Sequence, residues 1–412
     1  MKSFLLKQLQ DILRLLARAT IAKYRPYVIA VTGSVGKTSA KEAVHAALKD
    51  YRRVRRSRGN FNNELGVPLA ILGDWRKIEG PLFWARVMVF GVRRLLFRAE
   101  YPEILVLEYG VQKPGDMRYL LDIAKPAMAL VTALGDTPVH VEFFKNAEEL
   151  AREKARLPEA VLARGFAILN ADDKRVRAMK ENVRARVLTV GTKIDADVRV
   201  GRVENLELED GRPVGVTFKL EYRGNVVPVR LMGVLGTSHA YAAGFGIAAG
   251  LTFGLNLVSL AESFAKNYIP AKHRMTIVRG PNGANLIDDT YNASPLSMKA
   301  ALVAVKSLKP KRAIGVLGDM LELGEASDSA HAEVGKLVGK VFDALVTVGE
   351  KGKIIAKHSG LPAKNIVSVA TANDAIPVVK NLLKSGDLVL IKASRGIGLD
   401  VVVEALRESA KS

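Results

Sequence analysis

The fold of this chain is decided by the stretch VIAVTGSVGKTS, residues 28–39. Its opening residues are apolar or β-branched, which predicts a buried strand. A tight loop containing glycine follows, and residues 41–48 (KEAVHAAL) then predict a helix. In that order, backbone N–H groups and the positive end of the helix surround one point, and such an arrangement suits a phosphate group.

The loop predicts roles for individual side chains. We expect Lys37 to reach the outer phosphates of a nucleotide and the Thr38 hydroxyl to hold a magnesium ion. The standard phosphate-binding loop has a glycine at the position of Val31, whereas this chain has only Gly33 ahead of Gly36. The alternative is an ordinary strand–helix turn punctuated by glycine, but the strand and helix on either side favour phosphate binding.

Length and composition narrow the class of protein. The 412 residues are enough for two or three domains with large cores, and the 49% hydrophobic content is typical of a globular protein. No window is long and apolar enough to cross a bilayer, and we expect no secretory signal. The chain has no cysteine, which excludes disulfides and cysteine-ligated metal centres and fits a cytoplasmic enzyme.

The formal net charge is +20, and the positive charge is clustered. Lys and Arg crowd residues 49–58 and interleave with aromatic residues in 75–98. Such clusters fit nucleic acid, an anionic membrane or a polyanionic substrate such as a nucleotide, and the plain alternative is a solvated surface. No nucleic-acid-binding motif accompanies them, so we expect no nucleic-acid partner.

Two segments predict basic, amphipathic helices. Residues 3–24 carry apolar side chains near helical spacing, with Lys and Arg between them, and residues 74–100 form a second basic helical insert that is rich in aromatics. We expect the first helix, within residues 1–27, to pack on its own domain. Contact with the inner face of a membrane is the minor alternative.

Alternating strands and helices predict an α/β protein with two main domains. We expect a central ATP-binding domain over residues 28–270, built on a parallel sheet with a small antiparallel insert at 187–232. A boundary near Pro270 opens a C-terminal domain, 271–412, in which each apolar run ends in polar or glycine residues. That pattern predicts a doubly wound, Rossmann-like sheet whose ligand lies at the carboxyl ends of the strands.

Further polar residues stand near the ends of predicted strands. Glu108 directly follows an apolar run, and His140 comes shortly after the run at 128–131. Beside a phosphate loop, a carboxylate and an imidazole are plausible ligands of magnesium, which takes few protein ligands besides phosphate oxygens. The plain alternatives are a salt-bridged glutamate and a polar loop histidine. Residues 60–68 (NFNNELGVP) are dense in amides, which donate and accept hydrogen bonds.

Taken in order, these clusters resemble the Mur ligase family of ATP-dependent amide ligases. The resemblance spans residues 28–412. The strings that carry it are TGSVGKTS (32–39), GNFNN (59–63), EYG (108–110), PGD (114–116), the segment 144–154, LNADD (169–173), DDTYNASP (288–295) and GDMLELG (318–324). The last two favour the branch of the family that adds a D-Ala-D-Ala dipeptide.

The resemblance implies a role for each matching residue. Nucleotide would be bound by Gly33, Ser34, Gly36, Lys37, Thr38, Ser39, Arg274, Asp289, Tyr291 and Asn292. Two magnesium ions would be held by Thr38, Glu108, His140 and Lys154, the last as a carbamate that turns a cation into an anionic oxygen ligand. Substrate would contact Asn60, Asn62, Asn63, Lys392, Ser394 and Arg395. Lys37, Lys154, His140 and Arg274 would form the catalytic group.

The implied activity is amide-bond formation in the synthesis of peptidoglycan precursors. The carboxylate of a UDP-MurNAc-peptide would be activated by ATP as an acyl phosphate and joined to D-Ala-D-Ala, with release of ADP and phosphate. A hinge near Pro270 would let the domains close and exclude water from the acyl phosphate. We expect a monomer.

The chain departs from the family pattern at two places. His239 is followed by Ala240 where the family has a His–Asn pair, which leaves the adenine contacts there open. Few residues precede the strand at 28, where the family carries a domain that holds the UDP moiety. The insert at 74–100 is a candidate replacement for that domain.

Three alternatives stay open. A folylpolyglutamate-type ligase also lacks the UDP domain, but its loop has glycine where this chain has Thr38. A ligase acting on a lipid-linked acceptor would suit the basic helix, although the zinc-ribbon cysteines common in that branch are missing. From a different class, a P-loop NTPase could bind nucleic acid or membrane through the basic surface.

Overall fold

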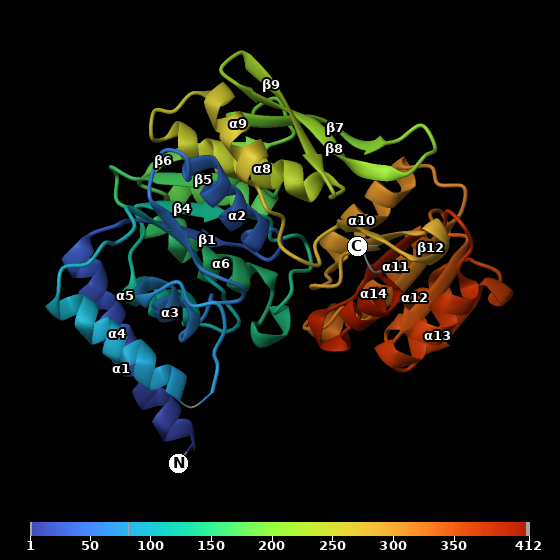
Figure 1. Ribbon diagram of the computed structural model, residues 1–412, viewed down its shortest axis with the longest axis horizontal. Coiled ribbons are helices and arrows are strands. Elements are labelled where there is room, and N and C mark those ends of the chain that lie inside the picture. The colour runs from blue at the N-terminus through green and yellow to red at the C-terminus, as the bar shows by residue number, and fades with distance from the viewer. Residues whose placement is uncertain (1, 81, 409–412) are drawn as a thin grey trace.

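The computed structural model describes residues 2–80 and 82–408. Two α/β halves lie side by side in Figure 1, with the N-terminal half at the left and the C-terminal half, in orange and red, at the right. The α/β class is therefore confirmed. Of the helices in the described part of the chain, none combines the length and apolarity that a bilayer crossing requires.

The larger sheet has nine strands in the order β2-β3-β1-β4-β5-β6-β7-β8-β9. Their bounds are β1 (Tyr27–Thr32), β2 (Val54–Arg56), β3 (Ile104–Glu108), β4 (Met128–Val131), β5 (Phe166–Asn170), β6 (Arg186–Gly191), β7 (Val198–Glu207), β8 (Pro213–Tyr222) and β9 (Asn225–Met232). In this order, the strands from β2 to β7, including β1, run parallel to one another. Strands β8 and β9 are added antiparallel at the end of the sheet.

The antiparallel part is smaller than the predicted insert at 187–232, and it is no separate unit. Strand β6, at the start of that range, pairs in parallel with β5. Antiparallel pairing therefore begins only between β7 and β8. The reason lies in burial, because β6 is exposed or half-buried over its first four residues and lacks a continuous apolar run. Strand β2, which has two arginines in three residues, gave no pattern to predict it.

Helices cover both faces of the larger sheet, because alternate residues of each strand point to opposite sides. Ile29 and Val31 of β1 face one helical layer, whereas Val28 and Ala30 face the other. The first layer consists of α2 (Lys37–Leu48), α8 (Thr237–Leu251) and α9 (Leu257–Asn267). The second consists of α1 (Lys2–Tyr24), α3 (Gly66–Leu72), α5 (Asp116–Ile123) and α6 (Ala147–Glu159), with α4 (Leu82–Leu96) against α1 and α3.

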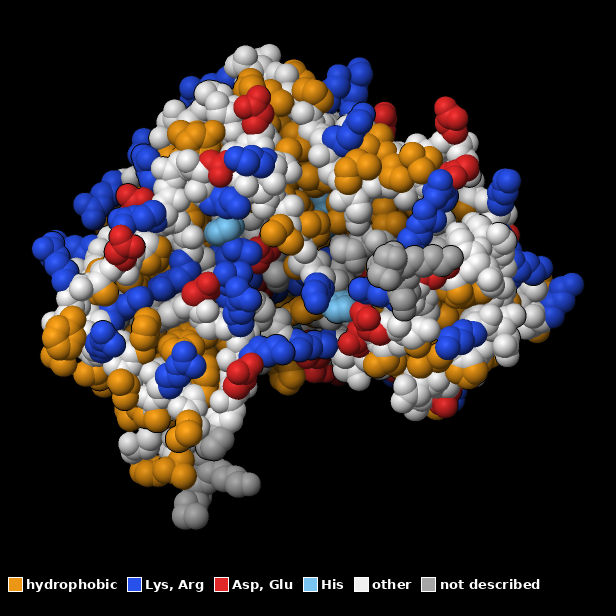
Figure 2. All heavy atoms as spheres, in the orientation of Figure 1, with side chains coloured by type: hydrophobic (Ala, Val, Ile, Leu, Met, Phe, Trp, Pro, Cys, Tyr) orange, Lys and Arg blue, Asp and Glu red, His pale blue; other side chains and the backbone are white. Residues whose placement is uncertain are grey.

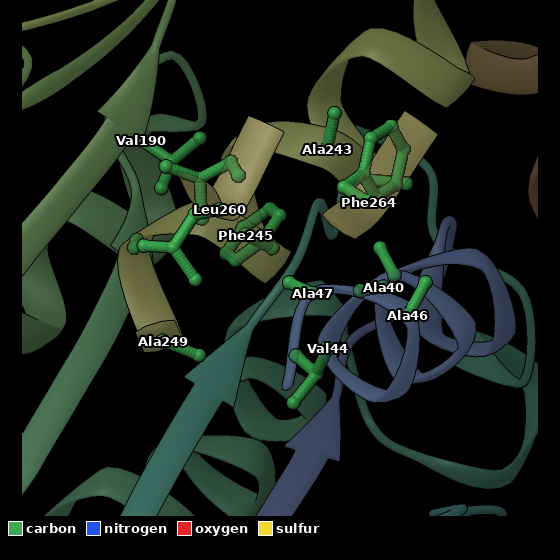
Figure 3. Packing of buried hydrophobic residues seen from close by; sticks show 14 of the residues in the cluster. Ala40, Val44, Ala46, Ala47, Val190, Ala243, Phe245, Ala249, Leu260 and Phe264 are labelled. Carbon is green, nitrogen blue, oxygen red and sulfur yellow. The ribbon is translucent and has the colours of Figure 1, made fainter. Parts of the chain in front are cut away.

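Within the first layer, the contact between α2 and α8 is the most extensive helix packing. Figure 3 shows Ala40 and Ala47 of α2 below the rings of Phe264 and Phe245, which α9 and α8 contribute. Gly246 of α8 lies against the backbone of α2, where a Cβ atom would stand 2.7 Å from the carbonyl oxygen of Ala43. The first layer thus holds the start of α2, and with it the glycine loop, in a fixed position.

The smaller sheet has six strands in the order β10-β11-β15-β12-β13-β14. Their bounds are β10 (Thr276–Arg279), β11 (Asn285–Asp288), β12 (Ala313–Gly318), β13 (Ala344–Val348), β14 (Ile366–Val369) and β15 (Leu388–Lys392). All pairs are parallel except β10 with β11. One face is covered by α10 (Pro295–Ser307), α11 (Ser327–Val338) and α12 (Gly352–His358), the other by α13 (Ala372–Leu382) and α14 (Asp400–Leu406).

The packing of α8 on α2 makes a stability prediction. We expect Gly246→Val to lower the free energy of unfolding by about 2 kcal/mol or more, because the added side chain meets backbone atoms that cannot rotate away. Ala22→Val, on an exposed position of α1, is the control and should change the stability by less than about 0.5 kcal/mol. Urea unfolding followed by circular dichroism measures both, and equal effects would contradict the proposed close approach.

Candidate active site

The glycine loop between β1 and α2 has the geometry of a phosphate cradle. Gly33 and Gly36 have φ values of 142° and 90°, which favour glycine. A Cβ atom on Gly33 would stand 2.0 Å from Thr132 Oγ1, so no larger residue fits there. The N–H groups of Ser34 and Val35 donate to the carbonyl of Ala133 at 2.8 and 3.0 Å, which pins the loop to the end of β4. No side chain of the described residues caps the start of α2.

Two lysines converge on this loop. Lys37 Nζ donates to the carbonyl of Gly33 at 3.0 Å, and Lys154 Nζ donates to the same carbonyl at 2.9 Å and to Ser34 Oγ at 3.0 Å. Lys154 extends from α6 and is fully buried. Burial, and after it the charge of Lys37, lowers the pKa of Lys154 well below its ordinary value. The structure therefore brings both predicted lysines to the glycine loop.

The carboxylate of Glu108, at the end of β3, is the centre of a buried polar cluster. Its Oε2 accepts a hydrogen bond from Thr38 Oγ1 at 3.0 Å, and its Oε1 accepts one from Asn62 Nδ2 at 3.1 Å. Lys41 Nζ, fully buried on α2, lies 3.7 Å from Oε2. Burial alone would raise the pKa of Glu108, but Lys41 and Lys37 bring it below its ordinary value. Glu108 is therefore an anion beside the Thr38 hydroxyl.

Arg274 reaches this cluster from the far side of the boundary between the halves. Its Nη2 donates to Thr38 Oγ1 at 3.1 Å, and its Cζ lies 4.0 Å from the centroid of the Tyr291 ring. Arg274 Nε is buried and has no hydrogen-bond partner among the described residues. A cation that faces the glycine loop with a free donor fits a phosphate oxygen.

His239 positions Arg274 and is itself enclosed. Its Nε2 lies 3.0 Å from the carbonyl oxygen of Arg274, and its Nδ1 lies 3.0 Å from the hydroxyl of Tyr268. Burial lowers the pKa of His239 to about 4, so the ring is neutral at neutral pH. The next residue, Ala240, is buried in the helix layer and offers no polar group. Neither residue lines the cleft described below.

The C-terminal half supplies a second set of predicted residues at the ends of β11 and β15. Lys392 Nζ lies 2.6 Å from Asp289 Oδ2 and donates to the carbonyl of Asn292 at 2.8 Å. Ser394 is buried and donates to the carbonyl of Ala293 at 3.3 Å. These bonds give Lys392 and Ser394 a structural part in shaping the loop after β11, whereas Arg395 is exposed.

A cleft with about 720 Å³ of empty space lies between the halves. The predicted nucleotide residues that line it are Ser34, Gly36, Ser39, Arg274, Asp289, Tyr291 and Asn292, with Lys392 beside them. Residues separated by more than two hundred positions in the sequence thus share one cavity.

A second cleft, with about 450 Å³ of empty space, adjoins Lys37. Asn62, Asn63 and His140 line it together with Glu64, Gln112 and Asp116. Asn63 also has a structural part, because its Oδ1 accepts from the N–H of Gly66 at 3.0 Å and fixes the start of α3. Asn60 does not line this cleft; its side chain accepts a hydrogen bond from the Tyr291 hydroxyl across the boundary.

His140 makes a further contact between the halves. Its Nδ1 lies 2.7 Å from Glu322 Oε2, in the segment after β12. The close approach of His140 lowers the pKa of Glu322 below its ordinary value. Both residues have positive φ values, 70° and 64°. His140 is therefore near Lys37 as expected, but in this arrangement its Nδ1 faces a carboxylate.

The residues present fit magnesium better than a metal held by protein alone. No group of three or more His, Cys, Asp and Glu side chains converges on one point within residues 2–80 and 82–408. Magnesium needs only one or two protein ligands when phosphate oxygens and water complete its shell. The Thr38 hydroxyl and the Glu108 carboxylate, in contact beside the glycine loop, are such a pair.

Sequence reasoning missed three residues of the site: Lys41, His239 as a support for Arg274, and Glu322. Lys41 follows the loop at helical spacing and looks like an ordinary surface lysine in the sequence. Glu322 lies inside the string GDMLELG, so its position could have been noticed. Its contact with His140 depends on how the two halves meet, which no local pattern contains.

Comparison with known proteins shows the family of this chain. The models of the Mur ligase middle domain and of the Mur ligase glutamate ligase domain match residues 88–244 and 273–395. The UDP-N-acetylmuramoyl-tripeptide--D-alanyl-D-alanine ligase of Mycobacterium tuberculosis is 32% identical over 401 residues, covering 92% of this chain and 72% of the relative. The chain belongs to the Mur ligase family. The enzyme of the same name from Bacillus subtilis is 31% identical to this Mur ligase over 407 residues, covering 97% and 80% of the two chains.

Solved structures place this Mur ligase in the same family. MurF from Thermotoga maritima in complex with ADP superimposes with a TM-score of 0.77 at 26% identity, covering 96% of this chain and 83% of that one. MurF from Acinetobacter baumannii gives 0.78 at 25%, covering 95% and 79%. Folylpolyglutamate synthase from Mycobacterium tuberculosis gives 0.68 at 17%, covering 97% and 93%, a likeness of fold alone.

The buried Glu108 makes a prediction about acid. Because its pKa lies below the ordinary 4.5, its contribution to stability is complete above that value and is lost as the pH falls through the lowered pKa. We expect Glu108→Gln to be less stable than the wild type near neutral pH by roughly 3 kcal/mol, since the buried Lys41 loses one of the two carboxylates near its Nζ and keeps only that of Glu42. The difference should shrink in acid.

Urea unfolding from about pH 7 down to about pH 3 measures this difference. Glu262→Gln, an exposed glutamate on α9, is the matched control and should follow the wild type at every pH. A penalty for Glu108→Gln that stays constant down to the lowest pH would show that the Glu108 charge is not what stabilises the cluster.

Proposed function

We propose that this Mur ligase joins D-Ala-D-Ala to the terminal carboxylate of UDP-MurNAc-tripeptide, with ATP as the energy source. The contact of Arg274 with Thr38 carries the proposal, because it puts a cation of the C-terminal half onto the phosphate loop of the central half. The similarity to enzymes named for this reaction, over more than nine tenths of the chain, supports the choice of substrates.

The first step transfers the γ-phosphoryl group of ATP to the acceptor carboxylate. The bond between the γ-phosphorus and the bridging oxygen breaks, a bond to the carboxylate oxygen forms, and ADP leaves. Lys37 and Arg274 lie where they can neutralise the charge on the transferring oxygens. The acyl phosphate is needed because a carboxylate by itself is a poor acyl donor.

The second step is attack by the amine of D-Ala-D-Ala on the activated carbonyl. The C–N bond forms, the amine loses a proton, and the tetrahedral intermediate collapses with release of phosphate. We assign the acceptor peptide to the cleft at Lys37, where Asn62 and Gln112 offer amide groups. The nucleotide occupies the larger cleft, so the γ-phosphate and the carboxylate meet at Lys37.

Magnesium completes the site in this proposal. Thr38 and Glu108 would hold one ion, and His140 with a carbamylated Lys154 would hold a second. When bound, the ions supply positive charge to the phosphate oxygens. The depressed pKa of Glu108 keeps the carboxylate ionised and so able to act as a ligand.

The environment of Lys154 supports its carbamylation. Only a neutral amine attacks carbon dioxide, and the lowered pKa of Lys154 increases the neutral fraction at neutral pH. One C–N bond forms, the amine releases a proton, and a carbamate anion results. The new group would neutralise the charge of the nearby Lys37 and add oxygen ligands beside Ser34.

We place the enzyme in the cytoplasm, where ATP and a nucleotide-linked sugar are available. All proposed site residues come from a single chain, so a monomer suffices. The proposed reaction uses small-molecule substrates and requires no nucleic acid. The basic residues around the cleft match the charge of a nucleotide.

Phosphate release tests the function. We expect release from ATP and magnesium only when UDP-MurNAc-tripeptide and D-Ala-D-Ala are both present, with a product of the mass of the joined peptide. Lys37→Ala should lose roughly a hundredfold or more in kcat, on the scale of a single electrostatic donor. Release that nucleic acid stimulates, with steep salt dependence, would instead favour a nucleic-acid-dependent NTPase.

Omitting each component in turn separates the outcomes. No release in the presence of both UDP-MurNAc-tripeptide and D-Ala-D-Ala would overturn the dipeptide assignment, and a mass shift with a lipid-linked or folate acceptor would reassign the substrate. Normal release from Lys37→Ala would show that the loop is not the phosphate site.

Carbamylation is tested separately by carbon-13 NMR after equilibration with labelled bicarbonate. We expect a carbamate resonance in the wild type that is absent in Lys154→Met and present in Lys37→Met. Circular dichroism checks that each variant is folded. If the wild-type and Lys154→Met spectra are identical, Lys154 is not carbamylated.

A further inference from the structure

Exposed apolar side chains are concentrated on two helices at one corner of the molecule. Within the described residues, twelve of the 25 large hydrophobic side chains that are exposed lie on α1, α4 and the residues beside α4. Six of them define what we call the α1–α4 face: Phe4, Leu5, Leu15, Leu82, Leu96 and Phe97. Figure 2 shows orange side chains gathered at the lower left, where Figure 1 places these helices.

This exposure does not result from loose packing, because the opposite sides of both helices are buried against the protein core. Leu13 and Ala17 of α1 are completely buried, as is Val87 of α4. Gly91 lets α4 approach its neighbours, since a Cβ atom there would stand 3.3 Å from Leu72 and 3.4 Å from Leu16. The outward apolar residues are therefore additional to those that the fold needs.

The two helices are also fastened to each other as one rigid element. Lys23 Nζ donates to the carbonyls of Arg94, Leu95 and Phe97 at 2.9, 2.8 and 3.0 Å. These carbonyls lie at the C-terminal end of α4 and just beyond it, where a cation is favourable. The Tyr24 hydroxyl donates to the carbonyl of Arg94 at 2.9 Å.

Positive charge surrounds this face. Residues 75–98 hold six Lys and Arg against one glutamate, and residues 4–24 hold four against one aspartate. Lys7, Arg93 and Arg98 are exposed and form no ion pair within the described part of the chain. Both tryptophans of the chain, Trp75 and Trp84, are half-buried against the cluster beneath these helices and are not part of the face. Exposed apolar side chains mixed with cations are the composition of a helix that lies in a membrane interface.

We propose that the α1–α4 face docks this protein on the surface of a bilayer that contains anionic lipid. The cores of protein–protein interfaces are depleted of charge, whereas here the cations are interspersed with the apolar residues, as an anionic headgroup layer requires. The apolar side chains enter the acyl boundary and the cations pair with headgroups. This proposal rests on the surface alone and is independent of the reaction that the cleft catalyses.

Sedimentation of the full-length protein with vesicles tests the proposal. We expect pelleting with vesicles of phosphatidylcholine that contain about one third phosphatidylglycerol, little pelleting with phosphatidylcholine alone, and release by ~0.5 M salt. Replacing two exposed apolar residues without changing the charge, in Leu96→Ser with Phe97→Ser, should lower the partition coefficient about tenfold or more. Replacing two exposed cations, in Arg93→Gln with Arg98→Gln, should weaken binding to the anionic vesicles and leave the weak binding to phosphatidylcholine vesicles unchanged.

Leu162→Ser with Ile194→Ser is the matched control, because it removes two exposed apolar side chains elsewhere on the surface. It should pellet like the wild type. All variants should keep their nucleotide-dependent activity in solution, which shows that they are folded. Absence of pelleting with anionic vesicles, or equal pelleting of the Leu96/Phe97 variant, would overturn the proposal. A wild-type dimer in light scattering that the Leu96/Phe97 variant abolishes would also overturn it, by assigning the face to a second copy of the chain.

Discussion

The carboxylate of Glu108 is the point on which the rest of the site depends. It accepts from Thr38 at the start of α2 and from Asn62 in the amide-rich loop, and it faces the buried ammonium of Lys41. Segments far apart in the sequence thereby meet at one buried carboxylate. A buried carboxylate without these partners would lower the stability of the fold, because an unpaired charge is costly to remove from water. The charge of Glu108 therefore depends on its neighbours.

Both halves of the molecule contribute residues to the candidate site. The central half supplies the glycine loop and the anion, and the C-terminal half supplies Arg274 and Tyr291. Two further contacts, His140 with Glu322 and Asn205 with Ala304, join the halves. The cleft that we assign to the nucleotide is lined by both halves and belongs to neither alone.

Much of this arrangement could be predicted from the sequence, because its signals are local. The strand–loop–helix at 28–48 and the apolar runs of the C-terminal sheet depend on residues that are neighbours in the chain, and both were predicted correctly. The parallel pairing of β6 was missed because its half-exposed residues lack the apolar run of a buried strand. The support of Arg274 by His239, and the pairing of Lys392 with Asp289, depend on tertiary contacts between distant segments. No periodicity or spacing carries that information.

The position of Arg274 has a thermodynamic consequence. A ligand that touches Thr38 on one half and Arg274 on the other binds more tightly when the halves are together, and by linkage it favours that arrangement by the same factor. Nucleotide affinity is therefore partly a measure of how the halves are arranged. An inhibitor confined to one half would be indifferent to that arrangement, whereas a bridging inhibitor would select it.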